Sequence, residues 1–578
     1  MKTKKNYIGL SVTPHDPALC ILNPDGSVVF AQASERYLQN KRAWHSPADD
    51  LFFVRKLIEE HCDPSNELVI SLSWGKRYLK INQNVIRLLK NTLVHSLITK
   101  TILGKKPIVA SFFHEFLSIG AGFNEHAGSN LAYQYYDMTK QTVTYRYFDH
   151  HLTHAAAACY SSAYEEASCA IIDGNGQNSA INFYHFQSGK LSRLPSNSIR
   201  VGSLGLFYWC ICKACGFNPM EGEEWKVMGL AAYGKLNEAY YARLKDCFKI
   251  DGLNIKVSTK SFDTLRKCLE MRRDKATPSM EYADFAYTGQ FVFTEYLSQL
   301  LCNLHDICPS DRLILGGGCA LNSSFVGLIQ QQTPFKQSYV FSAPGDDGNA
   351  VGAALLAYHQ DNPYQQRTEI QLPYLGSTMS EQSLSHLKQF SGLNIQSCCS
   401  MVDLIQQTAT LLSEGKIIGW VQGRAEFGPR ALGNRSIIAD PRQADVKKKL
   451  NEQVKFREEF RPFAPSILHE FGPDYFEDYQ ESPYMERTLQ FRQTVRDKVP
   501  GVVHVDGTGR LQTVKREWNQ YYYDLIKAFY DITGIPLILN TSFNVMGKPI
   551  IHRVEDALTV FFTSGLDVLV IENHIMLK

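Results

Sequence analysis

The chain has 578 residues, 44% of them hydrophobic and 20% charged, which is the composition of an ordinary soluble protein. It is too long for a single hydrophobic core, so we expect more than one domain. Sixty basic and 58 acidic residues leave a net charge of +2, which argues against a nucleic-acid partner or an anionic membrane surface. A small-molecule partner is therefore expected.

Three features of the sequence predict a cytoplasmic location. No apolar run approaches the roughly 18–20 residues that span a bilayer, and the first residues lead into a short strand without a signal-peptide core. The 14 cysteines are scattered, as free thiols in a reducing compartment are. Cys210, Cys212 and Cys215 lie close together, but a structural zinc site needs four ligands, so we interpret them as buried thiols of an apolar helix.

Two distant stretches of the first half repeat one pattern of a strand, a polar loop and a hairpin strand. The polar loops are at residues 13–16 and 173–176. The actin, sugar-kinase and Hsp70 ATPase superfold is built from two such units, with its site between them. We therefore expect an actin-like α/β fold here. The predicted strands are residues 7–12, 20–22, 28–31, 169–172 and 181–186.

Two further glycine-containing loops follow along the chain. Residues 316–322 come after a strand at 312–315, and residues 344–348 open a helix of small residues at 349–357. Glycines let the backbone approach a ligand, and a helix N-terminus favours an anion or a metal-bound carboxylate. Both loops are thus candidates for lining the same cleft.

The hydrophobic periodicity fades between residues 361 and 380. We place a domain boundary there, which divides the chain into residues 1–365 and 375–578. Beyond it, an amphipathic helix at 402–413 ends before Gly415 and precedes a strand at 417–421. The second domain is therefore predicted to be α/β as well.

A histidine pair marks a candidate metal site. After a strand at 143–148, Asp149 can cap a helix on which His150 and His154 share one face, one turn apart. Two imidazoles at this spacing can bind one metal ion. The same spacing also occurs in histidine clusters that bind no metal, so both interpretations stay open on this motif alone.

Carboxylates must complete such a site, because two histidines alone hold a divalent metal weakly. Asp173 and Asp346 are the best candidates, each at the tip of a glycine-flanked loop, and Asp347 is the alternative to Asp346. Two nitrogen and two oxygen ligands leave open positions for a substrate and suit Fe(II), Mn(II) or Zn(II). His15, in the first polar loop, is predicted to face the cleft and could accept a proton from an attacking hydroxyl. A lone histidine of this kind is more often a structural hydrogen bonder.

The second half concentrates arginines, glycines and amides in three segments, residues 423–436, 455–465 and 540–544. Arginine forks bind phosphate oxygens in pairs, and glycines admit backbone N–H donors beside them. Solvated charge is the alternative, but arginines among glycines and prolines do not form an ordinary helix face. We predict a pocket for a polyphosphate and a small carbonyl compound. Its candidate residues are Arg424, Arg430, Arg435, Lys455, Arg457, Arg461, Asn540, Ser542 and Asn544.

At these motifs the chain resembles the NodU/CmcH family of carbamoyltransferases, which includes the tobramycin and cephamycin enzymes. The FGPRALGNRSI and REEFRPFAP strings are highly specific for it. The matching strings, in chain order, are HDPALC, FDHHLTHAAAA, IIDGNGQ, KVMGLAAYGK, LGGGCALN, APGDDGNAVGAAL, EFGPRALGNRSIIADPR, KFREEFRPFAPSIL, HVDGTGRLQTV and LNTSFNVMGKPII. Two positions depart from the family pattern: Gln177 stands where a glutamate is usual, and the first string usually reads HDASAA.

The resemblance implies two domains and two reactions. The first domain is similar to the threonylcarbamoyl-transferase subunit of the tRNA-modifying machinery, an actin-like fold with a metal, and the second is similar to YrdC. The YrdC-like domain would form carbamoyl adenylate from carbamoyl phosphate and ATP, releasing pyrophosphate. The actin-like domain would pass the carbamoyl group to a hydroxylated small molecule or sugar, releasing AMP. The implied cofactors are Fe(II), or another divalent metal, and ATP with Mg²⁺; family members also often form homodimers.

The resemblance also implies roles for individual residues. His15 would be the base of the transfer step, and Lys455 and Arg457 would act in adenylate formation together with Ser542 and Asn544. The implied metal ligands are His150, His154, Asp173 and Asp346. The implied nucleotide contacts at the transfer site are Gly174, Gly176, Lys226, Gly317, Gly318 and Asn322.

Three other functions fit part of the pattern. A small-molecule kinase on an actin-like fold would form ADP, and it would leave the arginine-rich second half without a role. A tRNA-modifying transferase would need the basic stripe that this nearly neutral chain lacks. A binding protein without turnover would not need the complete set of candidate ligands and phosphate contacts. The acidic segment 220–225 could bind a cationic acceptor, although a solvated loop is the more common use of such a run.

Overall fold

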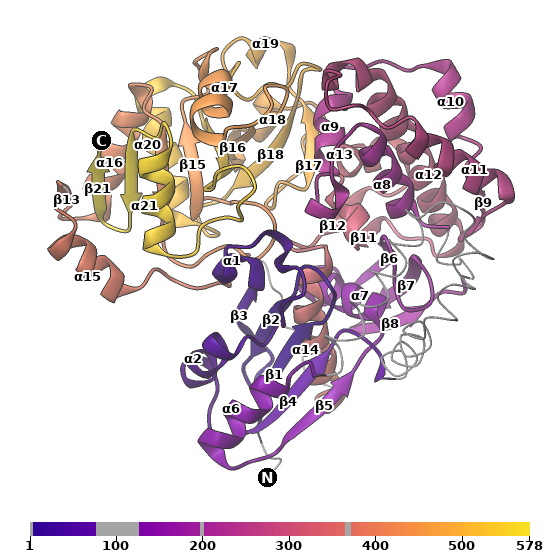
Figure 1. Cartoon of the computed structure of the whole chain (residues 1–578), viewed down its shortest axis with the longest axis horizontal. Helices are drawn as coiled ribbons and strands as arrows, with labels where there is room; N and C mark the ends of the chain where they lie inside the picture. Colours follow the sequence, from indigo (N-terminus) through magenta and orange to yellow (C-terminus); the bar gives the residue numbers. More distant parts are fainter. Residues whose placement is uncertain (1–3, 77–125, 197–201, 364–371, 393) are drawn as a thin grey trace.

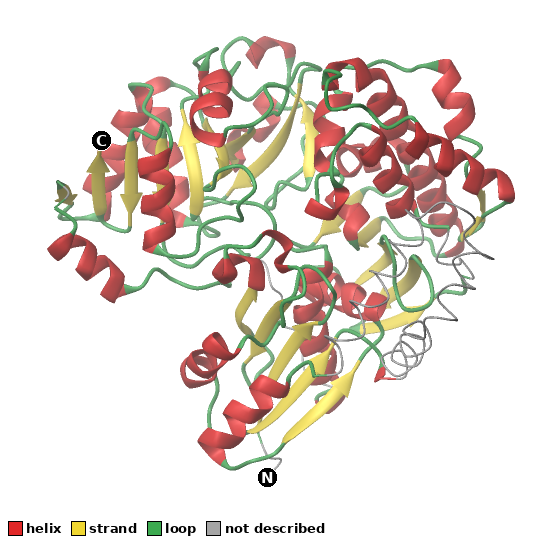
Figure 2. Ribbon diagram, viewed as in Figure 1, coloured by secondary structure: helices red, strands yellow, loops and turns green. Residues whose placement is uncertain are grey.

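The computed structural model describes residues 4–76, 126–196, 202–363, 372–392 and 394–578. Its first half contains two five-stranded sheets with the same order, β3-β2-β1-β4-β5 and β8-β7-β6-β11-β12 (Figures 1 and 2). In each sheet the hairpin strands are antiparallel, and the last three strands of the order are parallel. This duplicated order is that of the actin-like fold, as predicted. The strands are β1 Lys5–Ser11, β2 Ala18–Leu22, β3 Val28–Ala33, β4 Glu67–Leu72, β5 Val143–Tyr147, β6 Glu166–Ile172, β7 Ile181–Gln187, β8 Lys190–Arg193, β11 Arg312–Gly316 and β12 Gln337–Val340.

Two helices rich in alanine, α7 His150–Ser161 and α14 Asn349–Asp361, pack together between these sheets. They approach so closely that a Cβ atom on Gly352 would lie 1.8 Å from the Thr153 carbonyl oxygen. A Cβ atom on Gly9 of β1 would likewise lie 1.9 Å from the Ala350 carbonyl oxygen. Small side chains therefore allow this helix pair to fit between the sheets, and the first turns of both helices meet there.

Several helices form a layer beside the second sheet (Figure 1). Cys210, Cys212 and Cys215 are buried there as free thiols, in or directly after α8, which confirms that interpretation. Among the described residues, no helix is long and apolar enough to cross a membrane. The helices of this layer are α8 Leu204–Ala214, α9 Trp225–Ala231, α10 Glu238–Leu244, α11 Thr259–Glu270, α12 Ala283–Ile307 and α13 Ser323–Gln332.

The last third of the chain forms a nine-stranded mixed sheet of order β13-β21-β20-β14-β15-β19-β16-β18-β17. Helices α16 Met401–Ser413 and α20 Gln520–Thr533 pack against each other within its core. Gly415 after α16 has the left-handed φ of +86° expected of a helix C-cap glycine. This half is α/β, as predicted, and its YrdC-like character stays a prediction. The strands are β13 Ile395–Ser397, β14 Ile418–Val421, β15 Arg435–Ala439, β16 Ala464–Leu468, β17 Arg487–Gln490, β18 Thr508–Val514, β19 Leu537–Ser542, β20 Val568–Ile571 and β21 His574–Leu577.

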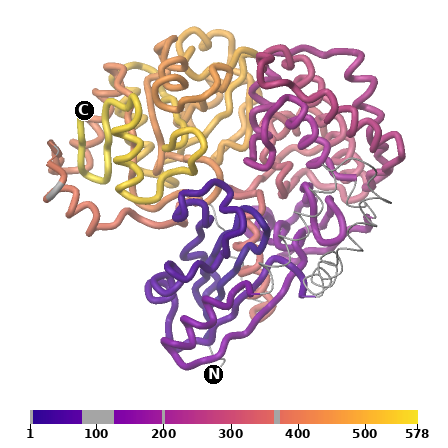
Figure 3. The backbone as a smooth tube through the Cα atoms, in the orientation of Figure 1, coloured from indigo at the N-terminus to yellow at the C-terminus, as the bar shows by residue number. Residues whose placement is uncertain are grey.

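The nine-stranded sheet lies beside both the helical layer and the first sheet (Figure 3). Strand β17 packs on α13, where a Cβ atom on Gly327 would lie 2.0 Å from the Thr488 carbonyl oxygen. On the other side, the Arg36 guanidinium donates to the Gly428 carbonyl at 2.8 Å. The two halves are therefore in close contact. The predicted boundary between residues 365 and 375 falls largely on residues 364–371, outside the described residues, and stays a prediction.

Candidate active site

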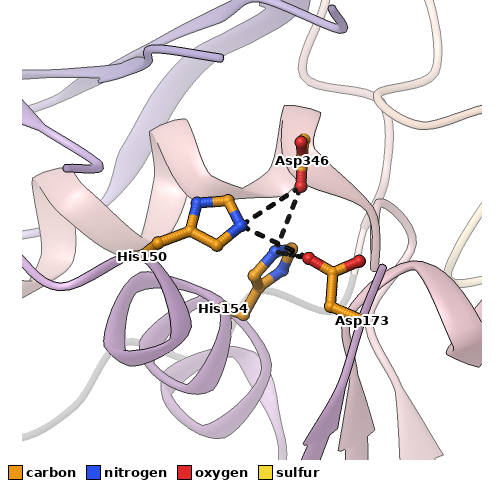
Figure 4. Close-up of side chains that lie close together, drawn as sticks. All are labelled: His150, His154, Asp173 and Asp346. Carbon is orange, nitrogen blue, oxygen red and sulfur yellow. Dashed lines mark hydrogen bonds and ion pairs between the residues drawn. The ribbon is translucent and has the colours of Figure 1, made fainter. Parts of the chain in front are cut away.

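Four side chains that are distant in the sequence converge between the two actin-like sheets (Figure 4). Nε2 of His150 lies 3.3 Å from Asp173 Oδ2 and 3.5 Å from Asp346 Oδ1. Nε2 of His154 lies 3.5 Å and 3.3 Å from the same two oxygens. One potential ligand atom from each residue thus falls within 4.8 Å of every other, as the ligands of a single ion must.

Local chain geometry places the two imidazoles on one face of α7. The Asp149 carboxylate accepts hydrogen bonds from the backbone N–H groups of His151, at 3.0 Å, and Leu152, at 3.1 Å. This N-cap starts the helix at His150, as the sequence predicted. Because an α-helix has 3.6 residues per turn, His154 then follows one turn later on the same face.

Each carboxylate is held by a different part of the duplicated fold. Oδ1 of Asp173 accepts hydrogen bonds from the backbone N–H groups of Gly174, at 2.8 Å, and Gly318, at 3.0 Å. Its Oδ2 therefore remains directed at the histidines. Asp346 opens the helical turn before α14, and its carbonyl accepts from the Ser11 hydroxyl at 2.6 Å. The end of β1 and the loops after β6, β11 and β12 thus meet at this cluster.

The structure distinguishes the two neighbouring aspartates. Asp346 faces the histidines, whereas the Asp347 carboxylate accepts a hydrogen bond from the backbone N–H of Gly348 at 3.1 Å. Burial, together with the negative charges of Asp16 and Glu35, raises the pKa of Asp347 to about 7. Asp346 is therefore the carboxylate that belongs to the cluster.

Opposite charges inside the cluster shift every pKa in it. Burial alone would lower the pKa of His150, but the carboxylates of Asp346 and Asp173 raise it to about 10. The pKa of His154 is raised against burial in the same way. Burial favours the protonated acids, yet the imidazoles hold the pKa values of Asp173 and Asp346 below their usual range. A divalent cation would neutralise the charge of the two buried carboxylates, and the two imidazoles would coordinate it as neutral ligands. The donor set fits a divalent metal.

Three neighbours of the cluster were not among the predicted site residues. The Asn349 amide nitrogen lies 3.0 Å from His154 Nε2, and the Trp74 ring stacks on His150 with 4.4 Å between centroids. Gln177 accepts a hydrogen bond at 3.0 Å from the backbone N–H of His150, so the unusual residue of the family pattern contacts the start of α7. Asn349 stands three positions after Asp346 in the APGDDGNAVGAAL string, and this spacing on one helical turn could have identified it as a neighbour of the cluster.

His15 lies at the edge of the cluster. Its Nδ1 is 3.7 Å from Asp346 Oδ2 and 2.8 Å from Asp16 Oδ2. The Arg42 guanidinium lies 2.9 Å from the same nitrogen and pairs with Asp16 at 2.8 Å. Asp16 and Arg42 thus orient the ring, and His15 lines the cleft as predicted from its loop.

One cavity of about 1640 Å³ joins the metal-ligand candidates to the C-terminal half. Asp173 and Asp346 line its actin-like side, together with Gly174, Gly318 and Asn322. Its other side is formed by the nine-stranded sheet and the loops at its edge. The residues there that the sequence predicted for the polyphosphate pocket are Arg430, Lys455, Arg457, Arg461, Asn540, Ser542 and Asn544.

Lys455 contacts two of the other predicted residues, Ser542 and Asn544. Its ammonium donates to the carbonyl oxygens of Ser542, at 2.7 Å, and Asn544, at 2.8 Å, and it contacts the side chains of both. Burial, reinforced by the charges of Arg457 and Arg461, lowers the pKa of Lys455 well below its usual value. Ser542 is the last residue of β19, and Asn544 lies in the loop directly after the strand.

Arg457 is rigidly placed beside this lysine. Its Nε donates to Asn451 Oδ1 at 2.6 Å, and its guanidinium lies over the Phe463 ring, 4.5 Å from the centroid. Burial and the nearby Arg461 lower the pKa of Arg457 well below its usual range. The planar guanidinium is therefore held in one orientation at the cavity wall.

Arg510 joins the cationic wall and was missed as a site residue. Burial lowers its pKa well below the usual value, and the charges of Arg430 and Arg457 add to this. Among the described residues, the Nε atoms of Arg510 and Arg461 are buried without a hydrogen-bond acceptor, although another guanidinium nitrogen of Arg461 pairs with Glu458 at 3.0 Å. A buried guanidinium such as that of Arg510, crowded by other cations, is unfavourable unless an anion neutralises it. The HVDGTGRLQTV string contains Arg510, but an arginine inside a strand does not show from sequence which way it points.

Two predicted phosphate contacts lie elsewhere, because they are structural. Arg424 donates to the carbonyls of Gly376, at 3.0 Å, and Val29, at 2.6 Å, and so joins the second half to β3. Arg435 begins β15, is fully buried and donates to the carbonyls of Gln422 and Gly423, both at 2.9 Å. Neither lines the cavity. Interior arginines that satisfy loop carbonyls cannot be told by composition from arginines that bind phosphate.

Three of the residues implied as nucleotide contacts also lie off the cavity wall. Lys226 forms ion pairs with Glu223 and Glu458, both at 2.7 Å, and thereby contacts the second half. Gly317 has a φ of +85° and packs against the Ile172 carbonyl, and Gly176 packs against the His151 ring. These glycines serve close packing of the loops around the cluster.

Replacing Arg435 with methionine is expected to destabilise the fold by about 3 kcal/mol or more, because several buried carbonyls would lose their donor. Urea unfolding followed by tryptophan fluorescence measures this change. Arg55→Met on the exposed face of α2 Leu51–His61 is the matched control and should leave the unfolding free energy nearly unchanged. An Arg435→Met protein of normal stability with weakened ATP binding would instead return Arg435 to the anion site.

The sequence matches two models of one protein family. Residues 6–355 match the family model described as the carbamoyltransferase N-terminus, and residues 409–578 match the model of the carbamoyltransferase C-terminus. The chain belongs to the carbamoyltransferase family. It is therefore a carbamoyltransferase enzyme, and the predicted resemblance is confirmed. The two matches lie on the actin-like half and the nine-stranded half, respectively.

Similar known proteins align with about three quarters of this chain. Nodulation protein NolNO of Sinorhizobium fredii (strain NBRC 101917 / NGR234) is 36% identical over 75% of this chain and 64% of its own length. Nodulation protein NolO of Bradyrhizobium diazoefficiens is 34% identical over 74% of this chain and 79% of its own. The solved structure of full-length HypF shares 11% identity, covers 62% of this chain and 47% of its own, and has a TM-score of 0.35. The strand order, and not that weak likeness, establishes the actin-like fold.

Proposed function

We propose that this carbamoyltransferase works through carbamoyl adenylate. Hydrolysis of carbamoyl phosphate releases phosphate and leaves carbamate. A carbamate oxygen then attacks the α-phosphorus of ATP, and pyrophosphate leaves. The hydroxyl of an acceptor then attacks the carbamoyl carbon, and AMP leaves. The observation that carries the proposal is the single cavity that connects the cationic wall of the nine-stranded half to the aspartates and His15 of the actin-like half.

The cationic wall suits the first reaction. Lys455, Arg457, Arg461 and Arg510 line the cavity as a cluster of basic side chains, and negative charge gathers on the phosphates as pyrophosphate leaves. Because Asn451 and Phe463 already fix Arg457, little reorganisation is needed during the reaction. We assign ATP, with its Mg²⁺, and carbamoyl phosphate to this wall, in the manner of a YrdC-like domain.

The histidine–aspartate cluster suits the second reaction. His150, His154, Asp173 and Asp346 would hold a divalent metal, with Fe(II) the ion that the family resemblance implies. Such a metal supplies Lewis-acid stabilisation of negative charge on an oxygen. His15, oriented by Asp16 and Arg42 at the cavity wall, would accept the proton of the attacking hydroxyl.

A kinase on the actin-like fold is the competing function. It would transfer the terminal phosphate of ATP and release ADP, so it would give the buried cations of the second half no substrate. Structure and chemistry both favour the carbamoyl route, since those cations face the same cavity as the metal-ligand candidates. The nucleotide product distinguishes the two reactions directly.

The first reaction should proceed without any acceptor. Enzyme, ATP and carbamoyl phosphate are expected to exchange labelled pyrophosphate into ATP, because carbamate adenylation is reversible while the intermediate stays bound. Scintillation counting of ATP on charcoal measures the exchange, and omission of carbamoyl phosphate is the control. Release of ADP without AMP and pyrophosphate would contradict the adenylate route and favour the kinase.

A further inference from the structure

One helix of the first half packs against a loop that carries part of the cationic wall. The helix is α9, which begins at Trp225, and the loop is residues 458–462. A Cβ atom on Gly229 of α9 would lie 3.4 Å from Pro462 Cδ and 3.7 Å from Phe460 Cδ2. The helix and the loop are therefore in van der Waals contact, and the loop cannot move toward α9.

Arg461 of this loop is held from the α9 side by two contacts. Its guanidinium carbon lies over the Trp225 ring, 4.0 Å from the ring centroid. Its Nη1 pairs with Glu458 Oε2 at 3.0 Å, and Oε1 of the same carboxylate pairs with Lys226 Nζ at 2.7 Å. Trp225 thus contacts the arginine directly, whereas Lys226 acts on it through Glu458. Both residues belong to the first half of the chain.

These contacts restrict a side chain of the cavity wall. Arg461 and Trp225 both line the cavity, and Arg461 is only 9% exposed. A free arginine side chain must be ordered when it binds an anion, which costs conformational entropy. The face of an indole ring attracts a cation and blocks one side of it, so the guanidinium has fewer orientations available. A guanidinium that is already fixed loses less entropy when the anion binds and when the reaction proceeds.

We propose that Trp225 is a positioning residue of the anion site, and that it acts by fixing Arg461. The actin-like half then completes the site in which the adenylate forms, although the phosphates contact the arginine and not the indole. Lys226 supports the same arginine through Glu458 and needs no contact with a nucleotide. This inference rests on the proposed adenylate formation, and it makes the first reaction depend on a residue of the other half.

The variant Trp225→Leu tests this role. We expect it to slow pyrophosphate exchange about 10- to 100-fold, because a displaced catalytic donor costs a rate factor of that order. Trp225→Phe keeps an aromatic face for the guanidinium and should retain most of the exchange. Trp518→Leu is the matched control, because Lys515 Nζ lies over the Trp518 ring, 4.7 Å from its centroid, and neither residue lines the cavity. Exchange in this control should be unchanged.

A double-mutant cycle identifies the route by which Trp225 acts. If the indole acts by fixing Arg461, Trp225→Leu should cause little further loss of exchange in an Arg461→Met protein. Lys226→Met removes a partner of Glu458, and it should slow exchange in the unmodified protein but add little to Arg461→Met. This variant tests the same arginine if urea unfolding shows that Trp225→Leu does not fold.

Binding of inorganic pyrophosphate provides a second measurement that needs no turnover. Calorimetry should show an affinity about 3- to 10-fold lower in Trp225→Leu, because the arginine must then be ordered on binding. The loss should again be absent in the Arg461→Met background.

Additive losses would overturn the inference. If Trp225→Leu slows exchange as much in the Arg461→Met protein as in the unmodified one, the indole acts by another route, such as direct contact with a substrate. Unchanged exchange together with unchanged pyrophosphate affinity in Trp225→Leu would also contradict it. An unmodified protein that binds pyrophosphate in the expected pattern but exchanges none would instead refute the adenylate route and leave the positioning of Arg461 intact.

Discussion

Replacing His150 with alanine is expected to reduce carbamoyl transfer about 1000-fold or more while pyrophosphate exchange stays near its original rate. The His150 ring contacts both Asp173 and Asp346, so its removal opens the proposed metal site. Loss of a bound metal removes several kcal/mol of charge stabilisation from the transfer step. The exchange reaction uses the cationic wall, which the substitution does not touch. His154→Ala should behave in the same way.

Three measurements on one preparation check this expectation: metal content by mass spectrometry, labelled product, and pyrophosphate exchange. His185→Ala is the matched control, because His185 in β7 of the same half pairs with the surface residue Glu166 at 3.2 Å and does not line the cavity. Equal loss of both activities in His150→Ala would mean that the cluster is structural or that the two reactions share one site.

Changing Arg457 to lysine is expected to slow pyrophosphate exchange roughly 30- to 1000-fold. Lysine keeps the charge but loses the planar donor that Asn451 orients and that lies over Phe463. The loss falls on the transition state, where charge builds on the departing pyrophosphate. Exchange kinetics at saturating ATP measure it.

Supplying carbamoyl adenylate to the Arg457→Lys enzyme separates the two reactions. Transfer from the ready-made intermediate should proceed much nearer the unmodified rate, because the histidine–aspartate cluster is intact. Arg442→Lys is the control, since Arg442 pairs with Asp440 away from the cavity. Full exchange in Arg457→Lys would remove Arg457 from the anion site and leave Arg430, Arg461 and Arg510 as its remaining arginines.

Local features of the site were readable from the sequence, because short-range geometry produces them. Asp149 caps α7 and places His150 and His154 one turn apart, and both facts depend only on neighbouring residues. The two strand–loop–hairpin units likewise repeat a pattern of alternating and turn residues, and this repetition predicted the actin-like fold. Glycine-flanked loops then indicated Asp173 and Asp346 as partners of the histidines.

The tertiary structure decides which way each of the other candidate side chains points. Arg424 and Arg435 stand in the same arginine–glycine segment as Arg430, yet only Arg430 lines the cavity, because the backbone turn sends the other two guanidinium groups to buried carbonyls. Arg510 faces the cavity from a strand whose register is set by its neighbours. The helical turn Asp346–Gly348 directs the Asp346 carboxylate, and not that of Asp347, to the histidines. The sequence by itself determined the family, the actin-like fold of the first half and the residue types of the candidate site. Tertiary structure decided which of those side chains share one cavity, because long-range packing sets their direction.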